Sequence, residues 1–107
     1  MKHVMIDLET LGTTADAVIM SIGAVKFDLE SSDIDDAGFY ASISIESNQS
    51  YGRVIDEGTL LWWLNQSAEA RQVFTEPKQS LDAGLAALSD WFGHNKRYVW
   101  SNGASFD

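Results

Sequence analysis

A chain of 107 residues, 45% of them hydrophobic, can form one domain with a buried core, and its lack of cysteine excludes disulfides and thiolate metal sites. A formal net charge of −9 at pH 7 argues against a basic surface for nucleic acid, so a polyanionic substrate would need metal ions to offset the repulsion. No apolar run approaches the roughly 18 residues of a membrane span, and the first expected strand begins too early to leave room for a signal peptide, so we expect a cytoplasmic protein without membrane contact.

The first expected strand, residues 4–10, is a short apolar run that carries two carboxylates. Successive side chains of a strand point to opposite faces, so Asp7 and Glu9 share one face while Ile6 and Leu8 take the other. Two carboxylates side by side repel each other, and a metal cation between them removes that cost. The spacing therefore indicates a divalent-metal site, with a strand end that merely reaches solvent as the alternative.

A central strand is expected next. Residues 11–16 are small and polar, as in a loop, and residues 18–27 are nearly all apolar, which is typical of a strand buried on both faces. The acidic residues 28–36 fit a solvated hairpin connection better than a calcium site, because their spacing is not that of an EF-hand loop.

Residues 39–46 alternate cleanly between apolar and polar side chains, with Phe39, Ala41, Ile43 and Ile45 inward. This alternation predicts a half-exposed strand. Three consecutive strands with short connections predict an antiparallel meander.

Helical spacing begins after Asp56, a suitable N-cap, with Leu60, Trp63 and Leu64 on one side of the expected helix. Trp62 and Trp63 point about 100° apart in a helix. We therefore expect one of them to pack in the core and the other to lie near the surface, where stacking on nucleobases is the alternative to a purely structural role.

Two further helices and a strand complete the expected elements. A short helix is predicted over residues 68–74, and a longer one from Ser80 to a C-cap at Gly93. The longer helix carries one apolar stripe, made of Leu81, Leu85, Leu88 and Phe92. Residues 98–100 predict a short strand.

The order strand, strand, strand, helices, strand resembles the first part of a ribonuclease H-like α/β fold, and the motifs are similar to those of the DEDD 3′-5′ exonuclease superfamily, the group of proofreading exonucleases and ribonuclease T. Residues 7–10, Asp-Leu-Glu-Thr, resemble its first motif, and residues 22–25, Ile-Gly-Ala-Val, a run in its second strand. Residues 102–107, Asn-Gly-Ala-Ser-Phe-Asp, resemble its second motif. Residues 59–71 are similar to a branch with phage-type exonuclease VIII-like proteins and small bacterial exoribonucleases.

The resemblance implies a metal-dependent exonuclease that hydrolyses phosphodiester bonds at the 3′ end of DNA or RNA with two Mg²⁺ or Mn²⁺ ions. It implies that Asp7 bridges the two ions, that Glu9 binds the ion that activates water, and that Asp107 binds the other. The implied substrate contacts come from Thr10, Leu11 and Asn102, with Leu11 as a wedge against the terminal base.

The third motif of that superfamily, a histidine and an aspartate on a later helix, would follow Asp107. Neither His3 nor His94 is expected to replace this histidine. We therefore expect residues 1–107 to be the N-terminal part of a single domain, truncated at its C-terminus, with weak activity or none. We expect a two-fold symmetric dimer to bury a face that would otherwise lack cover, lined by residues such as Val4, Ile6, Val99 and Trp100.

Two other functions remain open. A phosphatase of the haloacid-dehalogenase type also opens on a strand that ends in acidic residues, but Glu9 stands where its second aspartate is needed. A non-catalytic fragment or interaction module would keep the fold without the activity, and the missing third motif favours it for this chain.

Overall fold

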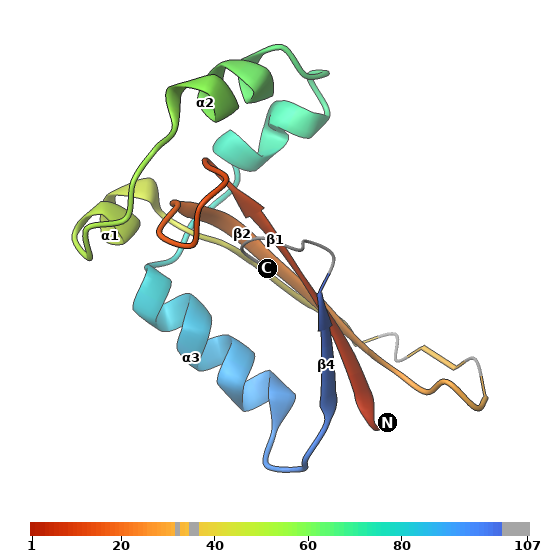
Figure 1. Cartoon of the computed structure of the whole chain (residues 1–107). Coiled ribbons are helices and arrows are strands. Elements are labelled where there is room, and N and C mark those ends of the chain that lie inside the picture. The colour runs from red at the N-terminus through yellow and green to blue at the C-terminus, as the bar shows by residue number, and fades with distance from the viewer. Residues whose placement is uncertain (32, 35–36, 102–107) are drawn as a thin grey trace.

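Four strands form a single sheet in the part of the chain that the computed structural model describes, residues 1–31, 33–34 and 37–101. They are β1 (His3–Thr10), β2 (Ile19–Phe27), β3 (Phe39–Ser42) and β4 (Tyr98–Ser101). In the sheet order β3-β2-β1-β4, the first three strands pair antiparallel and β4 runs parallel to β1 (Figure 1). The antiparallel meander predicted from the sequence is confirmed, within a mixed α/β structure.

The pairing of β1 with β2 contains one irregularity, at the end that carries the carboxylates. Glu9 lies opposite Ser21, but Thr10 lies opposite Ile19, so Met20 is skipped. The Met20 carbonyl instead accepts a hydrogen bond, at 2.8 Å, from the backbone N–H of the residue that follows β3. Bulges of this kind bend a strand and re-aim the side chains beside them.

The third strand is shorter than predicted. β3 ends at Ser42, and the segment that we expected to continue as a strand to residue 46 instead enters helix α1 (Ile45–Gln49). Ser44 caps this helix, because its hydroxyl accepts a hydrogen bond from the backbone N–H of Ser47 at 3.1 Å. The alternating pattern predicted a strand over this segment because the isoleucines on either side of Ser44 are apolar. They are buried in whole or in part in the structure, as they would be in a strand.

The remaining helices agree with the sequence in position. They are α2 (Glu57–Leu64), the 3₁₀ helix η1 (Ala70–Phe74) and α3 (Leu81–Phe92). Asp56 and Ser80 cap α2 and α3, as predicted, and Gly93 ends α3 with a φ of 84°. The segment predicted as a second α-helix is the shorter 3₁₀ turn η1. None of the helices in the described ranges combines the length and the apolar character that a membrane span requires.

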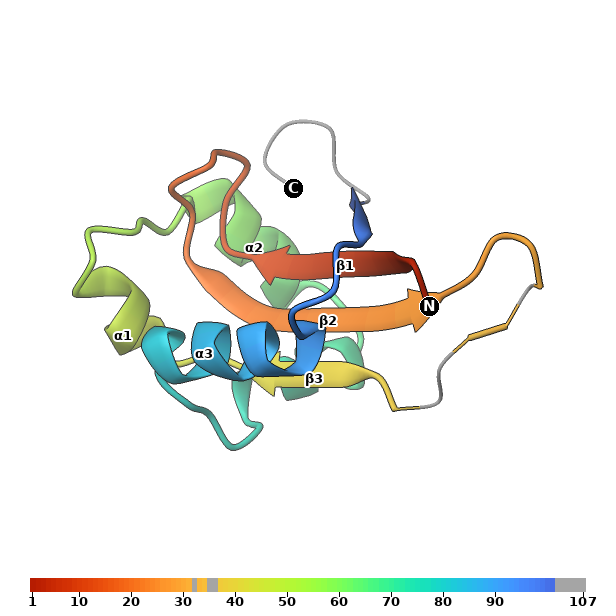
Figure 2. The ribbon, with the colours of Figure 1, turned by 90° about the horizontal axis from the view of Figure 1, so that it is seen from below.

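Helix α3 covers one face of the sheet, over β2 and β3 (Figure 2). The contact is close at Gly84, where an added Cβ would collide with Cδ1 of the fully buried Ile43. Leu85, expected in the apolar stripe, is 46% exposed, because the positions of α3 that meet the sheet are 81, 84 and 88. The cluster between α3 and the sheet consists of Ile22, Ala41, Ile43 and Leu81, with Ile6, Leu8, Ile19, Phe39 and Leu88 partly buried around it.

A second cluster holds the loop after β1 against α2 and η1, at the upper end of the sheet in Figure 1. It consists of Leu11, Val18, Met20, Trp63 and Val73. The indole N–H of Trp63 donates a hydrogen bond to the carbonyl of Thr10 at 3.0 Å. This contact attaches α2 directly to the end of β1.

The sheet face opposite α3 carries His3, Met5, Asp7 and Glu9 on β1. Large side chains on this face remain exposed, among them Val25, Tyr40, Tyr98 and Trp100. The expectation that Val4 and Trp100 line one uncovered face is wrong. Val4 is fully buried on the α3 side, whereas Trp100 pairs with Met5 and lies on the opposite side.

Candidate active site

Asp7 and Glu9 lie on the same face of β1, near its C-terminal end. The strand is regular through Glu9, so the alternation of side chains holds there, and this face is the one opposite α3. Asp7 is exposed and faces Gly23 across the strand pair, whereas Glu9 is half-buried and faces Ser21. The described structure therefore brings together the two carboxylates that the sequence singled out.

Ser21 contacts the Glu9 carboxylate directly. Its hydroxyl donates a hydrogen bond to Oε1 of Glu9 at 3.0 Å, and the residue is 1% exposed. Ser21 was not among the predicted site residues. Its role depends on the register of β1 and β2, and the apolar run 18–27 gives no sign of which residue faces Glu9.

Tyr40 lies on the same face, one strand further along. Its hydroxyl donates a hydrogen bond to Oε1 of Glu76 at 2.6 Å. Burial raises the pKa of Tyr40 to about 12, and the hydrogen bond and negative charge of Glu76 add to the effect. The Ser21 hydroxyl lowers this pKa in part, while the charge of Glu9 raises it slightly. The Tyr40 phenol thus stays protonated in the acidic surroundings of the two glutamates.

A hollow of about 390 Å³ lies over the sheet beside Asp7. Gly23 forms its floor, since an added Cβ there would meet only the Asp7 carbonyl within 4 Å, at 3.9 Å. Met5 and Val25 line one part of it and Tyr40 another. Asp7 therefore borders an open space rather than a packed side chain.

Carboxylate oxygens are the ligands that Mg²⁺ and Mn²⁺ prefer in proteins. Asp7 and Glu9 fit such an ion in donor type and in sharing one face. No group of three or more histidine, aspartate or glutamate side chains in the described ranges is placed to hold a metal ion. The predicted third ligand, Asp107, and the predicted substrate contact, Asn102, lie outside the described residues.

The other two predicted substrate contacts have structural roles here. The Thr10 hydroxyl donates a hydrogen bond to the carbonyl of Gly12 at 2.8 Å. Leu11 is fully buried in the cluster with Trp63 and Val73, so its side chain forms part of the core and does not reach a surface where it could wedge against a base.

The two adjacent tryptophans of α2 differ in burial, as predicted. Trp63 is 8% exposed and packs in the core, whereas Trp62 is 56% exposed. Their rings meet edge to face with centroids 5.2 Å apart. Because Trp63 also bonds to Thr10, the exposed Trp62 lies on the helix that adjoins the carboxylate end of β1.

The two histidines lie elsewhere. His3 stands at the start of β1, stacked against Phe27 and Tyr98, and its Nδ1 accepts a hydrogen bond from the Trp100 indole at 3.0 Å. His94 is exposed in the loop after α3.

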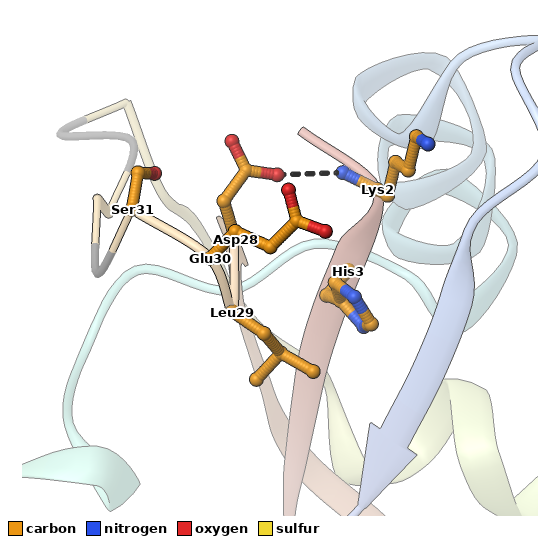
Figure 3. Close-up of a pocket in the computed structure, with 6 residues that line it drawn as sticks. All are labelled: Lys2, His3, Asp28, Leu29, Glu30 and Ser31. Carbon is orange, nitrogen blue, oxygen red and sulfur yellow. Dashed lines mark hydrogen bonds between the residues drawn. The ribbon is translucent and has the colours of Figure 1, made fainter.

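A second hollow, of about 510 Å³, adjoins His3 and is lined by the beginning of β1 and the segment after β2 (Figure 3). Asp28 accepts a hydrogen bond from the backbone N–H of Lys2 at 3.3 Å there, and the carboxylate of Glu30 lies nearby. This hollow is at the opposite end of β1 from Glu9.

Comparison with known proteins gives two matches. The profile of the 3′-5′ exoribonuclease Rv2179c-like domain family matches residues 2–107. An exodeoxyribonuclease of Enterobacteria phage T4 is 28% identical over 116 aligned positions, which cover 96% of this chain and 51% of that protein. The chain thus spans about half the length of the curated relative it matches. No solved structure matches it.

Proposed function

Because the chain belongs to the family of the 3′-5′ exoribonuclease Rv2179c-like domain, we propose that it acts as a nuclease on the 3′ end of nucleic acid. The observation that carries this proposal is the placement of Asp7 and Glu9 on one face at the end of β1, inside the matched region. The chain covers about half of the phage relative, so the activity of any longer protein is part of the proposal as well.

The mechanism that we propose is metal-dependent hydrolysis of the terminal phosphodiester bond. Bound Mg²⁺ or Mn²⁺ ions would polarise the phosphoryl oxygens and lower the pKa of the attacking water. Asp7 and Glu9 would hold these ions, with Asp107 as the third ligand. The carboxylates keep the site negative until cations bind, so a chain of net charge −9 would accept a polyanionic substrate only together with its metal.

For the fold, we propose the ribonuclease H-like class. The antiparallel order β3-β2-β1 followed by a parallel β4 supports it. The same order argues against the phosphatase alternative, since an antiparallel meander fits a doubly wound parallel sheet poorly. A cytoplasmic location, and self-association as a dimer, belong to this proposal too.

The second candidate function is a non-catalytic interaction module of the same fold. The observation that favours it is the exposed apolar and aromatic surface of the sheet face opposite α3, which includes Val25, Tyr98 and Trp100. Such a module would bind nucleic acid or another chain without hydrolysis. For the 107-residue chain assayed alone, we accordingly expect slow hydrolysis at most.

Oligonucleotides labelled at the 3′ or the 5′ end test the proposed function. DNA and RNA versions are needed, because the family description and the phage relative name different nucleic acids. We expect metal-dependent loss of the 3′ label first, abolished in Asp7→Asn and kept in Asp90→Asn, which changes an exposed carboxylate on α3. Activity that is equal in Asp7→Asn, or that proceeds without divalent metal, would refute the proposal.

A further inference from the structure

The contact between Ser21 and Glu9 joins two strands on the face that carries the candidate site. The two residues lie directly opposite each other in the antiparallel pair, so their side chains stand on the same face at close range. The Ser21 hydroxyl donates to Oε1 of Glu9 at 3.0 Å. Hydrogen bonds to an ionised acceptor are roughly twice as strong as those between neutral groups.

Ser21 lies in a strand that is paired on both sides, with β1 and β3, and the backbone just before it is held by further hydrogen bonds. Next to it, the carbonyl of Met20 is bonded to the backbone of Ile43 at 2.8 Å. One residue further, the fully buried Asn48 side chain holds both the N–H and the carbonyl of Ile19, each at 2.9 Å. The hydroxyl of Ser21 is therefore presented from a rigid part of β2 that has little freedom to follow a moving carboxylate.

The contact with Ser21 restricts the Glu9 side chain. A glutamate side chain has several rotatable bonds, and an exposed one samples many rotamers. With Oε1 accepting the hydrogen bond from Ser21, the carboxylate samples fewer orientations, and its remaining lone pairs can reach a cation. Groups that hydrogen-bond a metal-binding carboxylate commonly orient it in this way.

We propose that Ser21 is a positioning residue that holds the Glu9 carboxylate in the orientation needed to bind a divalent cation. The inference rests on the proposed function, because it takes Glu9 as a ligand. The inference adds to the proposed function a role for a buried serine on the neighbouring strand. Ser21 does not touch the metal or the substrate in this role; it acts through Glu9.

The chain offers a matched control. Ser42 on β3 lies opposite Ser21 on the same face and is also buried, at 6% exposed. Its hydroxyl accepts a hydrogen bond from Nζ of Lys78 at 3.3 Å rather than bonding to Glu9. Ser21→Ala and Ser42→Ala therefore remove the same atom from neighbouring buried positions, and only the first removes the contact with Glu9.

The test is the affinity of the 107-residue chain for Mn²⁺, measured by calorimetry or by the electron paramagnetic resonance of free Mn²⁺. Losing a group that orients a ligand typically costs about 10–100-fold in metal affinity. We expect a loss in that range for Ser21→Ala and less than about twofold for Ser42→Ala. If Ser21→Ala binds Mn²⁺ as the wild type does, or if Ser42→Ala loses as much, the proposal is overturned.

A second pair of variants tests the same proposal if Ser21→Ala folds poorly. Ser21→Thr and Ser21→Val have nearly the same shape, but only threonine keeps the hydroxyl. We expect Ser21→Thr to retain most of the Mn²⁺ affinity and Ser21→Val to lose it, and equal affinities would contradict the proposal. Mn²⁺ binding by the wild type that Asp7→Asn leaves unchanged would overturn the proposed function itself. Failure of the Ser21 variants alone leaves that function standing.

Discussion

At the scale of single residues, Tyr40 on the sheet face opposite α3 shows how burial and a neighbouring group change the pKa of a side chain. Burial is the main reason that its pKa rises from 10.0 to about 12, and Glu76 strengthens the effect. A folded-state pKa above the unfolded value means that folding retains the proton. The associated stabilisation is complete below about pH 10 and is lost as the pH rises through about 12.

We therefore expect the ultraviolet titration of phenolate absorbance to show a transition near pH 12 that is missing in Tyr40→Phe. Tyr51→Phe serves as the control, because the Tyr51 pKa is also raised, mainly by its hydrogen bond to Asp82 on a different surface. A wild-type chain whose tyrosines all titrate at their ordinary pKa would contradict the placement of Tyr40 beside Glu76.

Part of the candidate site was predictable from the sequence and part was not. Asp7 and Glu9 were recognisable because two carboxylates at strand spacing in an apolar run need only the alternation of one strand. Ser21 and Tyr40 were not, since their contacts depend on the register between strands and on a bulge at Met20. Leu11 was assigned as a wedge through the family resemblance alone, and the sequence did not reveal that α2 and η1 bury it.

At the scale of secondary-structure elements, the contact of α3 with β3 depends on Gly84. An alanine there would gain up to about 1 kcal/mol in helix propensity, but its Cβ would collide with Cδ1 of Ile43. Because Ile43 is fully buried, its side chain cannot move aside without disturbing the core. Overpacking of this kind costs about 1–3 kcal/mol.

We expect Gly84→Ala to lower the free energy of unfolding by about 1 kcal/mol, the difference between the overpacking cost and the propensity gain. Ile43→Val removes the colliding atom and costs about 0.5–1.5 kcal/mol alone. In the double variant the two losses should be less than additive, since the collision is gone. Denaturant unfolding of the four proteins measures this coupling, and strict additivity would show that the helix does not approach Ile43 closely.

The helices and strands were largely predictable where the hydrophobic pattern and the capping residues agree. The strands at both ends of the chain, the caps at Asp56 and Ser80, and the glycine after α3 follow from pattern and capping chemistry. Helix α1 was missed because its length of 5 residues is too short for a helical period to show. It is held in place by tertiary hydrogen bonds of Asn48 to β2, which no local pattern reveals.

At the scale of the whole molecule, the sheet face opposite α3 exposes Val25, Tyr98 and Trp100. Extended apolar patches are seldom left open on monomers. We propose that two copies of this chain associate through this part of the face, which lies beside His3 and Met5 at the start of β1 and leaves the end of β1 open to substrate. The net charge of −9 opposes this, and salt screens the repulsion.

Light scattering at micromolar concentration should show a dimer whose share increases with salt. Val25→Lys should shift the equilibrium toward monomer, whereas Leu85→Lys, at an exposed site on α3, should not. A monomer at every salt concentration would contradict the association, and an equal effect of both variants would contradict the choice of face.

The most direct measurement of the central claim is the binding of Mn²⁺ to the wild type, to Asp7→Asn and to Asp90→Asn. If Asp7 and Glu9 form a cation site, replacing Asp7 removes a ligand, and the loss should be no smaller than the roughly 10–100-fold caused by losing an orienting group alone. Asp90 lies exposed on α3, so its replacement should leave the affinity unchanged. Equal Mn²⁺ affinity in the wild type and Asp7→Asn would contradict the account.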